Sequence, residues 1–205
     1  MRVDLAVPES ALAIGAHPDD IEFECGATLA KWAAAGTTIH LLVCTDGRKG
    51  TWDIDADTGA LIIRRQTEQR EAARRLGATG EIRFLEQIDG ELDMGLDAGL
   101  ELRGKVARII RELTPTVVLT HDPWRRWRMH PDHRNAGWVS IDAVVGARDP
   151  HYFREHGIPH HRPESLLLFE SEEPDHVERV DRAHLDAKID ALLAHESQFE
   201  TTMEI

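Results

Sequence analysis

The chain has 205 residues, enough for one domain with a proper core, whereas a division into two domains would leave each half small. It carries 24 lysines and arginines against 37 aspartates and glutamates, a formal net charge of −13, which argues against non-specific binding to nucleic acid or to an anionic membrane. No apolar run approaches the roughly 20 residues that cross a bilayer, and residues 1–8 have neither a basic start nor an apolar core. We therefore predict a single cytoplasmic domain over residues 1–205.

Apolar runs alternate with segments of helical character along the chain. Buried strands are predicted at residues 11–16, 39–45, 81–86, 116–121 and 165–169. Helices are predicted at residues 20–36, 61–76, 98–113, 132–147 and 183–197. Glycine, proline and aspartate predict loops at residues 46–59 and 148–164, and the two separate cysteines, Cys25 and Cys44, are predicted to be buried thiols. This order favours an α/β fold with a mainly parallel sheet covered on both faces by helices.

Polar side chains follow the first strand in the stretch Ala16-His17-Pro18-Asp19-Asp20, which opens the first helix. In an open α/β sheet, ligands bind at the carboxyl ends of the strands. By itself this stretch is also explained by a helix N-cap, in which Asp19 or Asp20 accepts hydrogen bonds from helix amides. A second stretch, His130-Pro131-Asp132-His133, lies more than a hundred residues later and adds two imidazoles and a carboxylate. Together the two stretches favour a metal site with a built-in base.

A catalytic zinc ion takes three protein ligands, typically imidazoles and carboxylates, and keeps a position for water. His17, Asp20 and His133 supply two nitrogens and one oxygen for such a site. Asp19 is then free to take a proton from water, because zinc lowers the pKa of water from 15.7 to about 7.

His130 is predicted to face the other side of the reacting group as an acid or oxyanion stabiliser. Asp132 is predicted to orient the His130 ring through its second nitrogen. For His121 and Asp122, which end a predicted strand, a structural turn is the favoured interpretation.

Several motifs in this order resemble one family. They are AHPDDIE, a TDG loop, a segment from THDPW to HPDH, PHHRPE and a closing HESQF, and they extend over about residues 11–200. The chain thereby resembles the LmbE-like, PIG-L family of metal-dependent N-acetylglucosaminyl deacetylases, which implies a Rossmann-like three-layer α/β sandwich. No GxGxxG loop follows the first strand, so a dinucleotide cofactor is not implied.

The resemblance also implies roles for individual residues. His17, Asp20 and His133 would bind one zinc ion, Asp19 would be the general base, and His130 with Asp132 would complete the catalytic set. The predicted substrate-binding residues are Arg48, Arg65 and Asp89. A solvent-facing helix residue remains an alternative for Arg65, and a turn-forming role remains one for Asp89. Glu22 is either a partner behind the metal ligands or a first-turn carboxylate favoured by the helix dipole.

The chain also departs from the family pattern. Family members continue past the SQF segment for several tens of residues, including a tyrosine that helps to cover the site and stabilise the oxyanion. Here the sequence ends at Ile205 and its one tyrosine is Tyr152, so either the family's C-terminal segment is missing from this sequence or the protein uses another oxyanion donor, with His130 the obvious one. Family members are often assembled, and the resemblance therefore allows a homo-oligomer.

The main functional expectation is hydrolysis of an N-acyl bond, in particular the N-acetyl group of an amino sugar or a glycoconjugate. Zinc is the expected metal, and iron suits the same ligands. Two alternatives stay open, an amidase for a thiol-conjugate amide and a metal-binding domain without catalysis. A nucleic-acid binder that uses residues 124–128 conflicts with the net charge. Those arginines and tryptophans are instead expected to line the pocket mouth or to bind an anionic group of the substrate.

Overall fold

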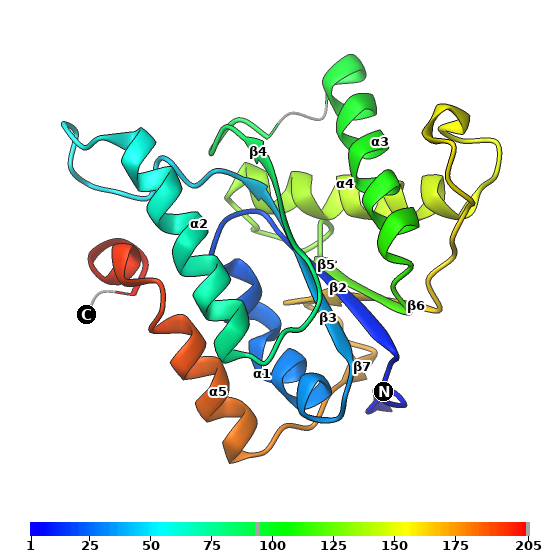
Figure 1. Ribbon diagram of the computed structural model, residues 1–205, viewed down its shortest axis with the longest axis horizontal. Coiled ribbons are helices and arrows are strands. Elements are labelled where there is room, and N and C mark those ends of the chain that lie inside the picture. The colour runs from blue at the N-terminus through cyan, green and yellow to red at the C-terminus, as the bar shows by residue number, and fades with distance from the viewer. Residues whose placement is uncertain (93–94, 204–205) are drawn as a thin grey trace.

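A five-stranded parallel sheet forms the centre of the computed structural model, which describes residues 1–92 and 95–203 (Figure 1). Its strand order is β4-β3-β2-β5-β6, and every neighbouring pair is parallel. The strands are β2 (Ser10–Gly15), β3 (Thr38–Thr45), β4 (Ile82–Gln87), β5 (Val117–His121) and β6 (Ser165–Phe169). The predicted α/β class with a parallel sheet is confirmed.

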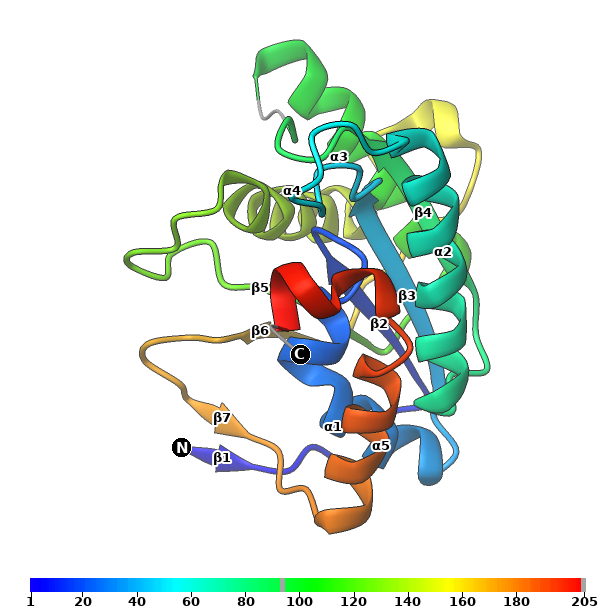
Figure 2. The ribbon, with the colours of Figure 1, turned by 90° about the vertical axis from the view of Figure 1, so that its left-hand side faces the viewer.

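Helices cover both faces of this sheet, as Figures 1 and 2 show. They are α1 (Asp20–Ala34), α2 (Thr58–Arg75), α3 (Leu96–Leu113), α4 (Pro131–Arg148) and α5 (Arg182–Leu192). Alternate residues of β2 point to opposite faces, so Ala11 and Ala13 pack in the core with α1, α2 and α5, and Leu12 and Ile14 in the core with α3 and α4. Burial on both faces explains why the strands are continuous apolar runs.

The predicted C-terminal boundary of the last helix, at residue 197, is wrong. Helix α5 stops at Leu192, and a 3-10 turn (Glu196–Gln198) and a π-helical turn (Phe199–Met203) follow. His195 leaves helical geometry, with φ −86° and ψ 57°, and its side chain is fully buried. Burial of this polar ring among other polar groups therefore overrides local helix propensity.

Smaller features lie outside the predicted elements. Strands β1 (Arg2–Val3) and β7 (His176–Val177) form a separate parallel pair, too short to show any periodicity in the sequence. A 3-10 turn (Arg154–His156) lies within the predicted loop at 148–164. The two cysteines are buried and free, as predicted. Among the described helices, none has the length and apolar character needed to cross a membrane.

The strand order places a crevice beside β2. The chain runs from β2 outwards through β3 to β4, and β5 then returns to the other side of β2 and is followed by β6. The connections after β2 and β5 therefore diverge at the carboxyl edge of the sheet, where open α/β sheets bind ligands. Both histidine-rich stretches follow these two strands, so the topology brings them together.

Arg111 on α3 ties the segment after α4 to the domain. Its buried guanidinium donates hydrogen bonds to backbone carbonyls, which belong to Gly146, Ala147, Asp149, Tyr152 and Phe153. One side chain thus supplies hydrogen-bond donors to backbone carbonyls at the end of α4 and in the loop that follows.

We expect Arg111→Met to lower the free energy of unfolding by roughly 3 kcal/mol or more, because buried carbonyls lose charged donors. At about 2–4 °C per kcal/mol for a chain of this size, thermal denaturation should show a midpoint at least ~6 °C lower. Arg108→Met is the matched control, since this arginine of the same helix makes a solvent-exposed ion pair with Glu112. Equal midpoints for the two variants would show that the carbonyl contacts contribute little.

Candidate metal centre

The three predicted metal ligands meet at the carboxyl edge of the sheet. His17 follows β2, Asp20 begins α1, and His133 lies in the first turn of α4. Nδ1 of His17 is 3.3 Å from Oδ2 of Asp20, and Nε2 of His133 is 3.2 Å from both Oδ1 of Asp20 and Nδ1 of His17. In a tetrahedral zinc site with bonds of 2.0–2.1 Å, ligand atoms lie about 3.3 Å apart. These donor atoms have the spacing that such an ion needs.

Carboxylates surround the His17 ring on both sides. Its Nε2 lies 3.1 Å from Oδ2 of Asp132 and 3.3 Å from Oδ1 of Asp89, and Asp20 faces Nδ1. Burial lowers the pKa of His17, but these three carboxylates outweigh burial and raise it well above its ordinary value. A buried site with this excess of negative charge calls for a cation. A divalent ion fits the donor set and would replace the proton on Nδ1.

Asp20 is enclosed by imidazoles. Beside His17 and His133, it has Nε2 of His121 at 3.3 Å from Oδ2. Burial raises the pKa of Asp20, but the rings of His121, His133 and His17 that face its oxygens hold this pKa well below its usual range. The carboxylate is therefore ionised and suited to bind a cation.

His121 belongs to the site, contrary to the turn interpretation. The residue ends β5 with no exposed surface, its Nε2 accepts a hydrogen bond from the Ala16 amide at 3.2 Å, and its ring stacks on His133 with centroids 4.6 Å apart. Asp122 does form the expected turn, because its Oδ1 accepts from the Trp124 amide. A polar ring at the end of an otherwise apolar strand was the available signal for His121.

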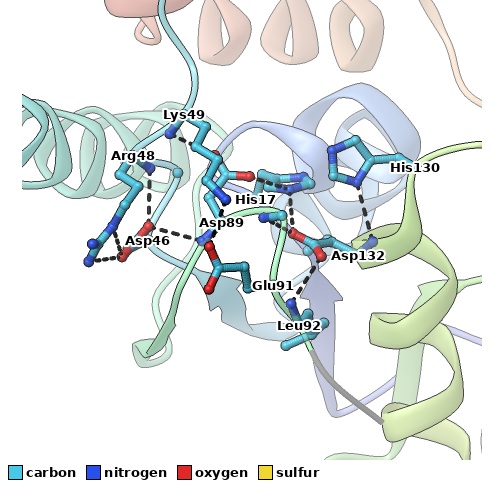
Figure 3. Close-up of polar contacts among 12 residues, drawn as sticks. His17, Asp46, Arg48, Lys49, Asp89, Glu91, Leu92, His130 and Asp132 are labelled. Atoms are coloured by element: carbon cyan, nitrogen blue, oxygen red, sulfur yellow. Dashed lines mark hydrogen bonds and ion pairs between the residues drawn. The ribbon is translucent and has the colours of Figure 1, made fainter. Parts of the chain in front are cut away.

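The predicted contact of Asp132 with the His130 ring is wrong. The Asp132 carboxylate lies on His17 instead, and it also accepts hydrogen bonds from the amides of Gly90 and Leu92 at 2.6 and 3.2 Å (Figure 3). Asp132 stands at the start of α4, where its fully buried side chain points under the turn after β4. Burial raises the pKa of Asp132, but these donors lower it overall, so the carboxylate accepts the Nε2 proton of His17. This leaves Nδ1 of His17 for the metal.

His130 has its ring orientation set by the backbone. Its Nδ1 accepts a hydrogen bond from the Asp132 amide at 3.3 Å, so the neutral ring carries its proton on Nε2 (Figure 3). Burial, with the neighbouring rings of His17 and His133, lowers the pKa of His130 and keeps it neutral at pH 7. The ring lies edge-on to His17 with centroids 4.7 Å apart. His130 can therefore donate a hydrogen bond at the metal centre.

Asp19 occupies the N-cap position of α1 with a strained backbone. Its φ is 107° and its ψ is −31°, and its side chain makes no capping hydrogen bond in the described structure. Asp20 also turns away from the helix amides, because its Oδ2 accepts from the His17 amide at 2.7 Å. The N-cap alternative is therefore not what holds these two carboxylates. Burial raises the pKa of Asp19 to about 6, although Arg65 opposes the rise.

Arg65 is a buried residue of α2 rather than a solvent-facing one. It lies in the wall of the site at 3% exposure and donates hydrogen bonds to the carbonyls of Gly47 and Pro18. Its Nη2 is also 3.2 Å from Oδ2 of Asp19. The guanidinium thus ties together the loops after β2 and β3, beside the predicted base.

Of the other two predicted substrate contacts, only Asp89 lies in the wall of the site. Its Oδ2 accepts from the Lys49 amide at 3.0 Å, while Oδ1 faces His17. The prediction for Arg48 is not supported, because its guanidinium pairs with Asp46 and it is not among the residues that line the cavity (Figure 3). Lys49, the next residue, lines the cavity instead, because adjacent residues of the loop direct their side chains differently.

A cavity of about 410 Å³ opens over these groups. Gln198 of the HESQF motif lines it. Several other lining residues belong to none of the quoted motifs, and these are Lys49, Gly50, Thr51, Trp52, Gly90, Thr201 and Thr202. Two loops and the segment after α5 supply them, so only the fold shows that they are neighbours. The volume lies within the range of small-ligand pockets.

The arginines and tryptophans of residues 124–128 do not line this cavity. Arg125 forms an ion pair with Glu170 at 2.7 Å, and Arg128 pairs with the same glutamate. The Trp124 ring packs edge-on against Trp138. These contacts secure the loop between β5 and α4 to the end of β6.

We expect Asp132→Asn to weaken metal binding by ~10–100-fold, because His17 loses the carboxylate that orients it and increases its basicity. A chelator-competition titration measures the affinity. Asp142→Asn, on the same helix and paired with Arg103 at 3.3 Å, is the control. If Asp132→Asn keeps the native metal affinity but lowers the reaction rate, the result would instead favour the predicted role of Asp132 in orienting His130.

Comparison with known proteins now identifies the family. Residues 12–144 match the PIG-L family, described as GlcNAc-PI de-N-acetylase. The chain belongs to the PIG-L family. The chain is 32% identical over 194 residues to the diacetylchitobiose deacetylase of Thermococcus kodakarensis, covering 93% of this chain and 70% of that protein. The resemblance inferred from the motifs is confirmed.

Other PIG-L relatives are similar over a smaller share of their length. A 1D-myo-inositol 2-acetamido-2-deoxy-alpha-D-glucopyranoside deacetylase of Streptomyces avermitilis is 33% identical over 172 residues, covering 72% of this chain and 57% of that protein. Among solved structures, the N,N'-diacetylchitobiose deacetylase of Pyrococcus horikoshii superposes with a TM-score of 0.86 at 28% identity. That match covers 94% of this chain and 71% of the Pyrococcus chain, and it confirms the three-layer fold.

Proposed function

We propose that this protein is a zinc-dependent hydrolase that removes the N-acetyl group from an amino sugar or a conjugate that contains one. The observation that carries the proposal is the convergence of His17 Nδ1, Asp20 and His133 Nε2 within 3.3 Å of one another, beside Asp19 in one cavity. Both the Thermococcus and the Streptomyces relatives are named as deacetylases of N-acetylated amino sugars, which supports this substrate class.

Zinc, held by His17, Asp20 and His133, would supply Lewis-acid polarisation of the amide carbonyl and would lower the pKa of water towards neutrality. Asp19 accepts the proton of the attacking water. Its carboxyl is suited to this task because it lines the cavity beside the proposed ligands, and burial raises its pKa above the usual range of a carboxyl group. Asp19 then returns the proton to the amine as the carbon–nitrogen bond breaks, so the reaction needs no further acid.

His130 stabilises the negative charge that develops on the carbonyl oxygen. Its Nε2–H is free to donate because Nδ1 accepts the Asp132 amide. A preorganised donor aimed at the position of the developing oxyanion stabilises the transition state. The polar groups of Lys49, Gln198 and Thr201 line the same cavity and are placed to contact sugar hydroxyls.

The proposal is tested with the whole chain, stripped of metal and reloaded with Zn²⁺ or, without oxygen, with Fe²⁺. Free amine is measured for N-acetylglucosamine, N,N'-diacetylchitobiose, a GlcNAc-inositol and a thiol-conjugate amide, with N-acetylalanine as a non-sugar control. We expect zinc-dependent amine release from at least one amino sugar and none from N-acetylalanine. One bound metal per chain with no release from any compound would contradict the proposal, as would release from the thiol-conjugate amide alone.

A further inference from the structure

The main chain at Asp19 is held in a conformation that a non-glycine residue rarely adopts. Its φ of 107° lies in the left-handed range, and the side chain gains no capping hydrogen bond in return within the described structure. Such strain persists only where surrounding groups hold it in place. The contacts of the Asp19 amide therefore show what maintains the direction of this carboxylate.

Gln69 is the partner of that amide. The Asp19 N–H donates to Oε1 of Gln69 at 3.0 Å, and Nε2 of Gln69 donates to Oε1 of Glu22 at 2.7 Å. A backbone N–H can only donate, so the oxygen of Gln69 must face Asp19 and the orientation of the Gln69 amide is unambiguous. Gln69 is fully buried on α2 and is not among the cavity-lining residues. Its influence on the site therefore passes through Asp19.

Glu22 and His195 continue this line of contacts behind the site. Both are fully buried, and Oε2 of Glu22 lies 3.5 Å from Nε2 of His195. Within the described chain, neither of these two atoms has a hydrogen-bond partner. Glu22 was predicted either as a partner behind the metal ligands or as a first-turn carboxylate, and it is a fully buried carboxylate of the first turn of α1 that stands behind the site. It faces Gln69 with one oxygen and His195 with the other.

The segment that carries His195 also reaches the other loops of the site. The Ser197 amide and hydroxyl donate to the Glu68 carboxylate at 2.9 and 2.5 Å, and Gln198 donates to the Gly50 carbonyl at 3.0 Å. Gln198 lines the cavity, and Glu68 precedes Gln69 on α2. In Figure 2 this last segment returns from α5 towards the start of α1.

We infer that Gln69 is a positioning residue, which holds the Asp19 backbone at positive φ and so aims the Asp19 carboxylate into the cavity. Glu22, backed by His195, holds the Gln69 amide in the one orientation that accepts the Asp19 N–H. Without that acceptor, a buried N–H is left unpaired and the strained residue is free to relax to negative φ, which redirects its side chain. The inference rests on the proposed function, in which Asp19 is the base.

The test replaces Gln69 by methionine, which has a similar length but neither an acceptor oxygen nor a donor. We expect kcat on the best amino sugar of the panel to fall by ~10–100-fold, the cost typical of losing an outer-shell partner, with KM and the metal content unchanged. Hydrogen exchange at the Asp19 amide, followed by NMR, should become faster while the amides of β3 stay protected. Gln66→Met, at a half-buried position of the same helix whose side chain donates to Glu86, should leave both readouts unchanged.

A second pair of variants keeps the test decisive if Gln69→Met does not fold. Glu22→Gln keeps an oxygen that accepts from Gln69, whereas Glu22→Leu removes it, so kcat should be higher in Glu22→Gln than in Glu22→Leu. Equal kcat values in this pair, or a native kcat in folded Gln69→Met, would overturn the inference. Asp19→Asn is assayed in parallel. If Asp19→Asn retains the native rate, the proposed function fails. If Asp19→Asn is inactive while the Gln69 and Glu22 variants keep the native rate, only the positioning role fails.

Discussion

Asp19→Asn is expected to lower kcat by ~10²–10⁴-fold, the usual contribution of a general base. Asparagine tolerates the positive φ at this position better than most residues, and its amide oxygen can still accept from Arg65. The substitution therefore removes the proton acceptor while keeping the backbone and its neighbours. Initial rates of amine release with saturating amino sugar measure the effect.

Metal content distinguishes loss of the base from loss of the site. Asp19→Asn should retain one metal ion per chain, because His17, Asp20 and His133 are unchanged. Asp175→Asn, an exposed aspartate far from the motif stretches in sequence, serves as the control and should keep the native rate. A native rate in Asp19→Asn would remove Asp19 from the mechanism.

His133→Ala is expected to abolish stoichiometric metal binding. Only His17 and Asp20 of the proposed ligands remain, so the loss of affinity should exceed the ~10–100-fold that removal of an outer-shell partner costs. The ring lies at the start of α4 and is partly exposed, so its removal leaves the hydrophobic core intact. Metal analysis after dialysis, together with amine release, measures the result, and exposed His160 supplies the control His160→Ala.

Thermal denaturation gives a readout of the same variant that does not depend on activity. At zinc concentrations 1,000 times the dissociation constant, binding stabilises the native state by about 4.1 kcal/mol. For a chain of this size that corresponds to a midpoint roughly 8–16 °C higher with zinc than without. We expect this shift in the unaltered protein and in His160→Ala but not in His133→Ala. An equal shift in His133→Ala would exclude His133 as a ligand.

The chemistry of the site was predictable because it is concentrated in two short stretches that follow buried strands. His17 and Asp20 lie three residues apart, and His130 and His133 have the same spacing after a second strand. A parallel α/β sheet brings the carboxyl ends of neighbouring strands to one edge, so pairing the two stretches required no detailed coordinates. The ligand-sized spacing of His17, Asp20 and His133 agrees with that expectation.

The partners of these residues were not predictable in the same way. Asp132 contacts His17 rather than its neighbour His130, because the first turn of α4 directs the two side chains differently. For the same reason Lys49, and not the predicted Arg48, lines the cavity, since adjacent loop residues point in different directions. Such outcomes depend on side-chain direction, which sequence spacing alone does not provide.

The sequence by itself determined the parallel α/β class and the place of the two histidine stretches after buried strands, and it predicted a division of His17, Asp20 and Asp19 between metal binding and proton transfer. Tertiary structure alone decided that His121 faces Asp20, and that Gln69, Glu22 and His195 stand in line behind Asp19. The physical reason is that strand and helix patterns are local, whereas buried polar groups must find partners from any element that packs beside them. At Asp19, Gln69 and Arg65 of α2 supply these partners, one to the backbone amide and one to the carboxylate.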